Sequence, residues 1–232
     1  GTASGAIDID TSSNGTVNIV GNLTTTGAAH DDNTGSAGGA VNIDTSGSGT
    51  IAVGAITTTG GAYTGASGNG GAAGLITLNT GVTGPPNITL NGTLSAIGGA
   101  KGASGGTQGA GGAITISDPA LLGGNIAITT GDTAGNILFS STVNSVTSTR
   151  TLTLTAGTGD VTFNGIVGGT LALSTLTASG ANIDINESIT TLGALVDLDA
   201  TTSVDLASGK SITTMAAVNT GTISGAIDID TS

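Results

Sequence analysis

The sequence has no cysteine and almost no aromatic or basic residues. It contains 2 Phe, 1 Tyr and no Trp. It has 3 Lys and Arg residues against 15 Asp and Glu residues, so its net charge is −12. Without cysteine there can be no disulfide framework and no thiolate metal site. So few cations exclude nucleic-acid binding, which needs several of them on one face, and attraction to anionic membranes. No apolar run approaches the 18 residues of a spanning helix, so we expect no membrane insertion.

Charge of either sign is also scarce, at 8 % of the 232 residues, whereas ordinary globular domains carry about 25 %. There are 43 Gly but only 3 Pro, a ratio that excludes collagen. Hydrophobic residues reach 37 % and recur regularly, which argues against a disordered Gly-rich chain. Because large rings are missing, we expect a thin core of Ile, Val, Leu and Ala.

A long repeat links the two ends of the sequence. Residues 1–12 recur as residues 221–232 with one difference, Ala3 against Ile223, at an offset of 220 residues. This predicts one module over residues 1–220, with 221–232 as the first strand of the next tandem copy. Within the module we expect long rungs over 1–111 and compact rungs over 112–220.

A shorter repeat of 34 to 38 residues separates Ile7, Val41, Ile76 and Ile114. Around each of these residues, apolar and polar side chains alternate with period two between Gly, Asn, Ser and Asp turn formers, as in half-buried strands. We predict second strands at residues 16–19, 50–53, 87–90 and 125–128, and third strands at 22–27, 55–60 and 93–98. Later strand cores are expected at Ile137–Phe139, Leu152–Leu154, Val161–Phe163, Leu171–Leu173, Ile183–Ile185, Leu195–Leu198 and Val204–Leu206.

The extra length of the first rungs falls in three equivalent inserts, Ala28–Ala37, Ala62–Ala73 and Gly99–Gly111. Equivalent inserts in a solenoid stack as loops on one side. The sequence therefore predicts an all-β fold, a parallel β-helix (β-solenoid) of about eight rungs per module with Gly-rich loops along one side. At about 4.8 Å per rung, one module would advance about 40 Å.

Acidic residues provide the main candidate metal ligands. Asp8 and Asp10 should point outward, with Asp10 stacked near Asp44 and then Asn79, and Asp228 and Asp230 repeat this pair. Stacked carboxylates repel, and Ca²⁺ could relieve the repulsion, so Asp8, Asp10 and Asp44 are candidate calcium ligands; the alternative is a solvated acidic face. No other cofactor is expected. His30, beside Asp31 and Asp32, is a weaker metal candidate against a solvated loop.

Threonine runs at residues 24–26 and 57–59, and the alternating Thr151, Thr153 and Thr155, predict Thr ladders on the outer surface. Flat Thr arrays occur in ice-binding solenoids, although Thr is also an ordinary outward strand residue. The sequence offers few residues that could carry out catalysis. Sugar-cleaving sites need clustered carboxylates with basic or aromatic partners in a groove, so we expect no enzyme activity.

The segment 152–213 resembles the β-strand-repeat regions of giant Gram-negative surface proteins, the filamentous-haemagglutinin-like and large adhesin class. The phrases that carry the resemblance are Gly-Thr-Gly-Asp-Val-Thr-Phe-Asn-Gly at 157–165 and Gly-Gly-Thr-Leu-Ala-Leu at 168–173. It implies a right-handed parallel β-helix, export to the cell surface, and a role in adhesion or surface structure.

A solenoid exposes unpaired strand edges at both ends, and no capping element is evident in the sequence. We therefore expect a structural repeat of an extracellular filament or giant surface protein. Its partners would be neighbouring copies of the module, in one chain or stacked end to end. The alternative is an adhesin stalk that binds a glycan, a surface or ice through the insert loops or the Thr ladders.

Overall fold

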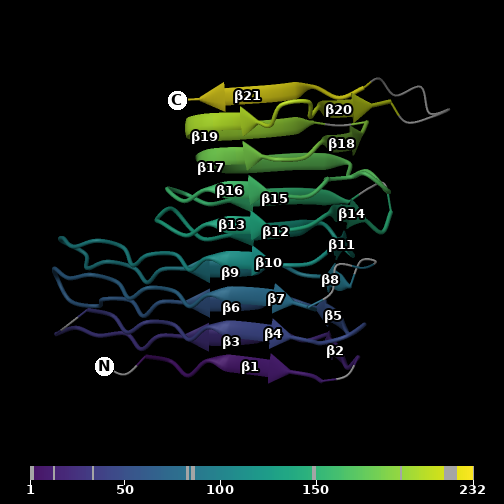
Figure 1. Cartoon of the computed structure of the whole chain (residues 1–232). Helices are drawn as coiled ribbons and strands as arrows, with labels where there is room; N and C mark the ends of the chain where they lie inside the picture. Colours follow the sequence, from purple (N-terminus) through teal and green to yellow (C-terminus); the bar gives the residue numbers. More distant parts are fainter. Residues whose placement is uncertain are drawn as a thin grey trace.

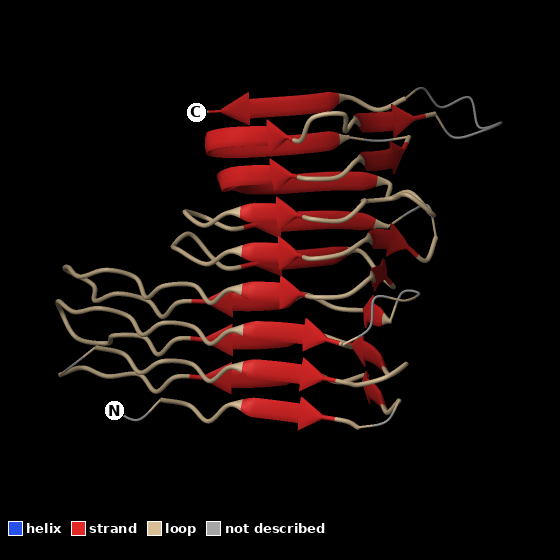
Figure 2. Ribbon diagram, in the orientation of Figure 1, coloured by secondary structure: helices blue, strands red, loops and turns tan. Residues whose placement is uncertain are grey.

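The chain forms one stack of parallel strands, seen in a computed structural model (Figure 1). The structure describes residues 3–12, 14–32, 34–81, 84, 87–147, 150–193, 195–216 and 224–231. Within these ranges every regular element is a strand (Figure 2), and there is no helix long and apolar enough to cross a membrane. The expected parallel β-helix is confirmed.

Each rung has three positions, which we call face 1, face 2 and face 3 in chain order. Face 1 consists of β1 (Ile7–Asp10), β4 (Val41–Asp44), β7 (Ile76–Asn79), β10 (Ile114–Ile116), β13 (Ile137–Phe139), β16 (Val161–Phe163) and the second halves of β17 (Thr175–Ile185) and β19 (Val196–Leu206). Face 2 consists of β2 (Thr16–Ile19), β5 (Thr50–Val53), β8 (Ile88–Leu90), β11 (Ala120–Leu122), β14 (Val143–Ser145), β18 (Ile189–Leu192) and β20 (Ile212–Met215).

Face 3 begins with β3 (Leu23–Thr26), β6 (Ile56–Thr59), β9 (Leu94–Ile97), β12 (Ile126–Thr129) and β15 (Thr151–Thr155). The first halves of β17 and β19 and finally β21 (Ile227–Thr231) continue it. Over the described residues these strands make eight rungs. Because β17 and β19 run through the corner without a break, faces 3 and 1 join into one sheet.

Strict register between rungs builds the core. Ile7 pairs with Val41, and the same column continues through Ile76 and Ile114. The alternation expected from the sequence turns these side chains inward, and Val41, Ile76 and Ile114 are fully buried. Each rung contributes one inward side chain to such a column, and aliphatic side chains are large enough to fill the space. The two Phe residues lie in one such column, where the stacked rings of Phe139 and Phe163 have centroids 5.6 Å apart.

The three inserts stack on one side of the lower rungs (Figure 1), as expected. We call the described parts of residues 27–39, 60–74 and 98–112 the glycine flap. Backbone hydrogen bonds cross it in a zigzag between outgoing and returning arms. In this series Ser36 N donates to Ala28 O (3.0 Å), Gly61 N to Ser36 O (2.7 Å), Gly71 N to Gly61 O (2.8 Å), Gly99 N to Gly71 O (2.8 Å) and Gly109 N to Gly99 O (2.9 Å).

Glycine is required in the flap because the arms approach too closely for side chains. A Cβ on Gly71 would overlap the carbonyl oxygen of Ser36, and one on Gly61 would overlap that of Ala28. The obstacles are backbone atoms, which cannot rotate away as a side chain can. This explains why the glycines concentrate in the inserts, and why the inserts stack as an ordered layer.

Two predicted strands were wrong in detail. Residues 125–128 belong to face 3 rather than face 2, since Ile128 pairs with Leu94 and Leu154. The second strand of that rung is Ala120–Leu122, whose sequence Ala-Leu-Leu has no alternation. Residues 171–173 are not a strand: Val167 and Leu173 form bridges on face 2, and the chain between them leaves the sheet at Gly168, whose φ is +72°.

We predict that Gly71→Ala loosens the glycine flap. The added Cβ must displace the Ser36 carbonyl, and overpacking of this kind costs about 1–3 kcal/mol. Hydrogen exchange of the Gly61, Gly71 and Gly99 amides should accelerate. Gly21→Ala is the matched control, because its Cβ meets nothing within 4 Å. Equal exchange in both variants would contradict this account of the flap.

Candidate functional site

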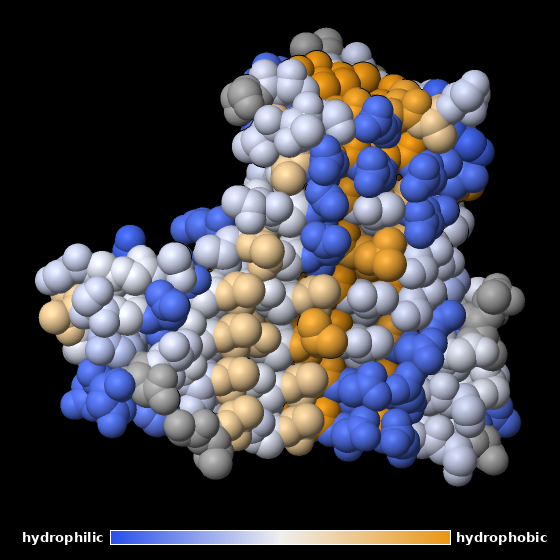
Figure 3. Space-filling model, turned by 60° about the vertical axis from the view of Figure 1, so that its left-hand side comes forward, coloured by the Kyte–Doolittle hydropathy of each residue, from blue (hydrophilic) through white to orange (hydrophobic). Residues whose placement is uncertain are grey.

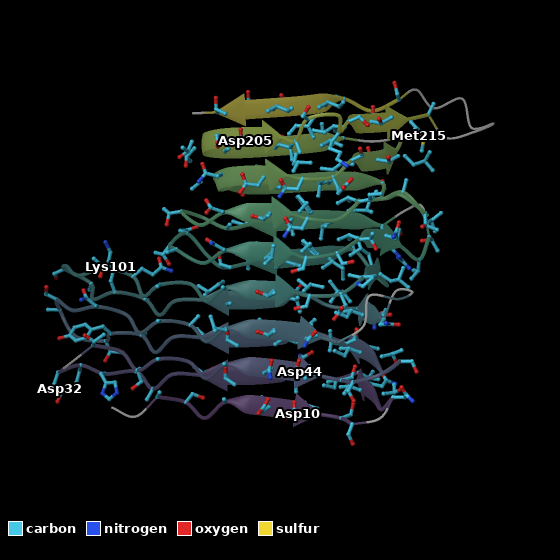
Figure 4. All side chains as sticks on the ribbon, viewed as in Figure 1. Asp10, Asp32, Asp44, Lys101, Asp205 and Met215 are labelled. Atoms are coloured by element: carbon cyan, nitrogen blue, oxygen red, sulfur yellow. The ribbon has the colours of Figure 1, made fainter. Side chains whose placement is uncertain are left out.

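The candidate calcium residues lie on the outer side of face 1 at the lower end of the stack, where Figure 4 labels Asp10 and Asp44 on adjacent strands. Pairing of β1 with β4 places Asp8 beside Asn42 and Asp10 beside Asp44. The expected stacking of Asp10, Asp44 and Asn79 is confirmed.

Amide groups are interleaved with these carboxylates. Asn42 Nδ2 donates to Asp8 Oδ1 at 3.0 Å and to Asp44 Oδ2 at 2.5 Å, while Asn79 Nδ2 donates to Asp44 Oδ1 at 2.8 Å. These amide N–H groups satisfy carboxylate oxygens of Asp8 and Asp44. Among the described residues there is no group of three or more His, Cys, Asp or Glu that could hold a metal ion. Calcium at Asp8, Asp10 and Asp44 stays a prediction.

His30 lies within the glycine flap, where its Nε2 atom is 3.0 Å from the hydroxyl oxygen of Ser36. The contact joins the outgoing and returning arms of the first insert. Asp31 and Asp32 are exposed, and Figure 4 places Asp32 near the outer end of the flap. The imidazole therefore has a local structural partner of its own.

The upper end of the stack carries the strongest electrostatic perturbation. β21 pairs with the first half of β19 so that Asp228 lies beside Asp197 and Asp230 beside Asp199. Partial burial raises the pKa of Asp197, and repulsion from Asp199, Asp228 and Asp230 raises it further. β21 has the sequence of β1, but β19 offers carboxylates where β4 offers the Asn42 amide.

An open hollow of about 610 Å³ lies beside this acidic cluster, at the corner between faces 3 and 1. Its polar lining comes from Asp132, Asp199 and Asp230 together with the hydroxyls of Thr155, Ser179, Thr201 and Thr231. Among the described residues that line the hollow there is no basic or aromatic side chain. The hollow thus offers carboxylates and hydroxyls, without the partners that a sugar-cleaving acid–base pair uses.

Both ends of the stack expose apolar side chains that the neighbouring rung would otherwise cover. At the upper end Leu206, Met215, Ile227 and Ile229 are 42 %, 44 %, 45 % and 48 % exposed. Figure 3 shows hydrophobic residues gathered at this end of the molecule. At the lower end Ile7, Ile9, Ile19 and Leu23 are only partly buried. Sequence reasoning anticipated open edges but did not place the acidic cluster beside one of them.

Comparison with protein-family models, with curated proteins and with solved structures found no match to this chain.

We predict that Asp197→Asn strengthens the pairing of β21 with β19 at neutral pH. Because the pKa of Asp197 is raised in the folded state, folding favours its protonated form. Stability is therefore greatest below the unfolded value of 3.8 and is lost as the pH rises through the folded pKa. Removing one like charge from a cross-strand pair is worth about 0.2–1 kcal/mol.

Hydrogen exchange of the β21 amides measures this effect. Their protection should rise in Asp197→Asn at pH 7, and the gain should vanish at acidic pH. Asp31→Asn is the control, since it removes the same charge from an exposed flap residue. Added Ca²⁺ should protect β21 in the wild type if the carboxylates bind it. A pH-independent difference between the variants would refute the electrostatic explanation.

Proposed function

We propose that the chain is a structural module of an extracellular filament or giant surface protein, in which the solenoid continues through successive copies. The observation that carries the proposal is the placement of β21. This strand repeats the sequence of β1, and it extends the parallel sheet by pairing with five consecutive residues of β19, Val196–Ala200. The strand sequence that begins the module can therefore also pair with β19 at the module's upper end.

The exposed ends support the same proposal. Inward columns stop at half-exposed Leu206, Ile227 and Ile229, and the last described strands present unpaired N–H and C=O groups. A following copy would cover the apolar side chains and satisfy these groups. Adjacent repeats in a solenoid stabilise one another through such interfaces.

Composition supports a structural role outside the cell. The core consists of aliphatic columns, and the chain holds only 3 Lys and Arg and 3 aromatic residues, so common proteases have few cleavage sites. Absence of cysteine suits an oxidising compartment, because no free thiol can be oxidised.

We predict that a two-copy chain is more heat-resistant than one copy. The chain consists of residues 1–232 continued by residues 13–232 of a second copy, which preserves the 220-residue repeat. Covering the open end buries several half-exposed side chains, and each kcal/mol gained raises the melting temperature by about 2–4 °C. Circular dichroism at rising temperature measures the midpoint.

Junction variants test where the gain arises. Ile229→Asp in the first copy places a charge in the shared core and should return the midpoint to that of a single copy. Asp228→Asn, on the adjacent outward position, is the control and should keep the gain. Two copies that melt as one copy does would mean that modules are independent, and the proposal would fall.

A second candidate, binding to a glycan, a surface or ice, is favoured by the outer side of face 3. Of the expected Thr runs, Thr24 pairs with Thr57 on this outer side, whereas Thr25 and Thr58 are buried and point inward. The outward hydroxyl column continues through six rungs. The column runs from Thr24 through Thr57, Ser95, Thr129 and Thr155 to Ser179. Such a regular line of hydroxyls could match a repeating polar surface.

If face 3 binds ice or a glycan, Thr57→Lys with Thr155→Lys should abolish binding, because both residues point outward in the hydroxyl column. Ice-crystal growth inhibition and retention on immobilised glycans are the measurements. Thr16→Lys on face 2 is the control and should bind like the wild type. No difference between the two variants would reject face 3 as a binding surface.

A further inference from the structure

The strand β21 repeats the sequence of β1 but lies on a different face of the solenoid. β1 lies on face 1, where it pairs with β4. β21 has the same sequence but lies on face 3, where its Ile229 continues the column that starts at Leu23 and passes through Leu154 and Leu198. The same residues therefore face a different direction about the solenoid axis.

This placement fixes the number of turns in one repeat. Over the described residues β1 opens the first rung on face 1, and β21 closes the eighth rung on face 3. The 220-residue repeat therefore spans seven and two-thirds rungs rather than a whole number. We propose that each following copy of the module is rotated by about one third of a turn relative to the copy before it. This inference rests on the proposed function, since it applies where copies continue one solenoid.

The core tolerates the rotation. After β21, the second copy's β2 would lie on face 1, with Val17 and Ile19 above Val204 and Leu206. Its β3 would lie on face 2, with Leu23 above β20. The inward positions below Val17, Ile19 and Leu23 are apolar, so these hydrophobic columns continue although the faces have exchanged strands. The other inward position of β3, Thr25, would lie above Thr214, in the column that holds the buried Thr191.

A following copy in this position gives one carboxylate of the acidic cluster an amide partner. At the lower end, the Asn42 amide of β4 donates to Asp8 in β1 and to Asp44. When β4 of the second copy pairs with β21, its Asn42 lies beside Asp228, the residue equivalent to Asp8. That amide gives Asp228 the partner that β19 does not provide, beside the carboxylates of Asp197, Asp199 and Asp230.

The rotation determines where the glycine flaps point. In the first copy the flap leaves the stack at the corner between faces 3 and 1, where the chain passes from β3 to β4. In the second copy these strands lie on faces 2 and 3, so the flap leaves at the corner between those faces. A third copy would present it at the remaining corner. The surface pattern would then repeat after three copies, or twenty-three rungs, about 110 Å along the axis.

Flap directions are measurable because the chain contains no cysteine. Lys101 is exposed near the outer end of the flap (Figure 4), so Lys101→Cys in both copies of the two-copy chain accepts one spin label in each. Flaps on one side would place the labels about one axial repeat apart, on the order of 40 Å. Rotated flaps give a narrow distribution at a clearly longer distance. Electron micrographs of a three-copy chain should show flaps in three directions.

The outcomes separate the rotation from the function on which it rests. A raised melting temperature with a narrow distance near 40 Å, or flaps along one side, would overturn the rotation and leave the continuous solenoid in place. A broad distance distribution, with a melting temperature equal to that of one copy, would overturn both. Hydrogen exchange that shows β21 unprotected in the single module would also overturn the rotation, because its placement on face 3 would be lost.

Discussion

Backbone hydrogen bonding between successive rungs, in strict parallel register, is the constraint on which this molecule depends. It places like positions above one another about 4.8 Å apart, so each choice of residue is repeated as a column. Aliphatic columns such as Ile7–Val41–Ile76 can be only one side chain deep, which is why the core manages almost without rings. In the flap the same spacing leaves room for glycine alone, because backbone carbonyls occupy the Cβ positions.

Register has an electrostatic cost on the outer faces. A column of identical acids would place like charges about 5 Å apart. In the lower rungs Asp10 does lie beside Asp44, but Asp8 lies beside Asn42, and the amides of Asn42 and Asn79 donate to Asp8 and Asp44. In the upper rungs Asp228 lies beside Asp197 and Asp230 beside Asp199. Partial burial raises the pKa of Asp197, and repulsion from Asp199, Asp228 and Asp230 raises it further. The upper end of the module is therefore apolar in its interior and acidic on its surface. A following copy would cover the apolar side chains and place the Asn42 amide beside Asp228.

Much of the fold could be predicted because a β-solenoid is local in pattern. Period-two alternation and equivalent inserts identified the strands of the first three rungs and the side on which the loops stack. Prediction failed where the pattern was missing: Ala120–Leu122 is too short and uniformly apolar to show alternation, so residues 125–128 took its place. The candidate sites were harder to predict from the sequence, because the hydrogen bonds of Asn42 and Asn79 to carboxylates join residues more than thirty positions apart.

The sequence by itself determined the inward and outward residues of most strands, the position of the inserts and the 220-residue period, because these follow from patterns within a few residues or from direct identity. Only the tertiary structure decided on which face the repeated strand lies. That face depends on the total number of strand positions in the module, counted at three per rung. A misassigned short segment, such as Val167–Leu173 on face 2, changes this total by one position, or a third of a rung. The period is thus a property of the sequence, whereas its phase about the axis is a property of the fold.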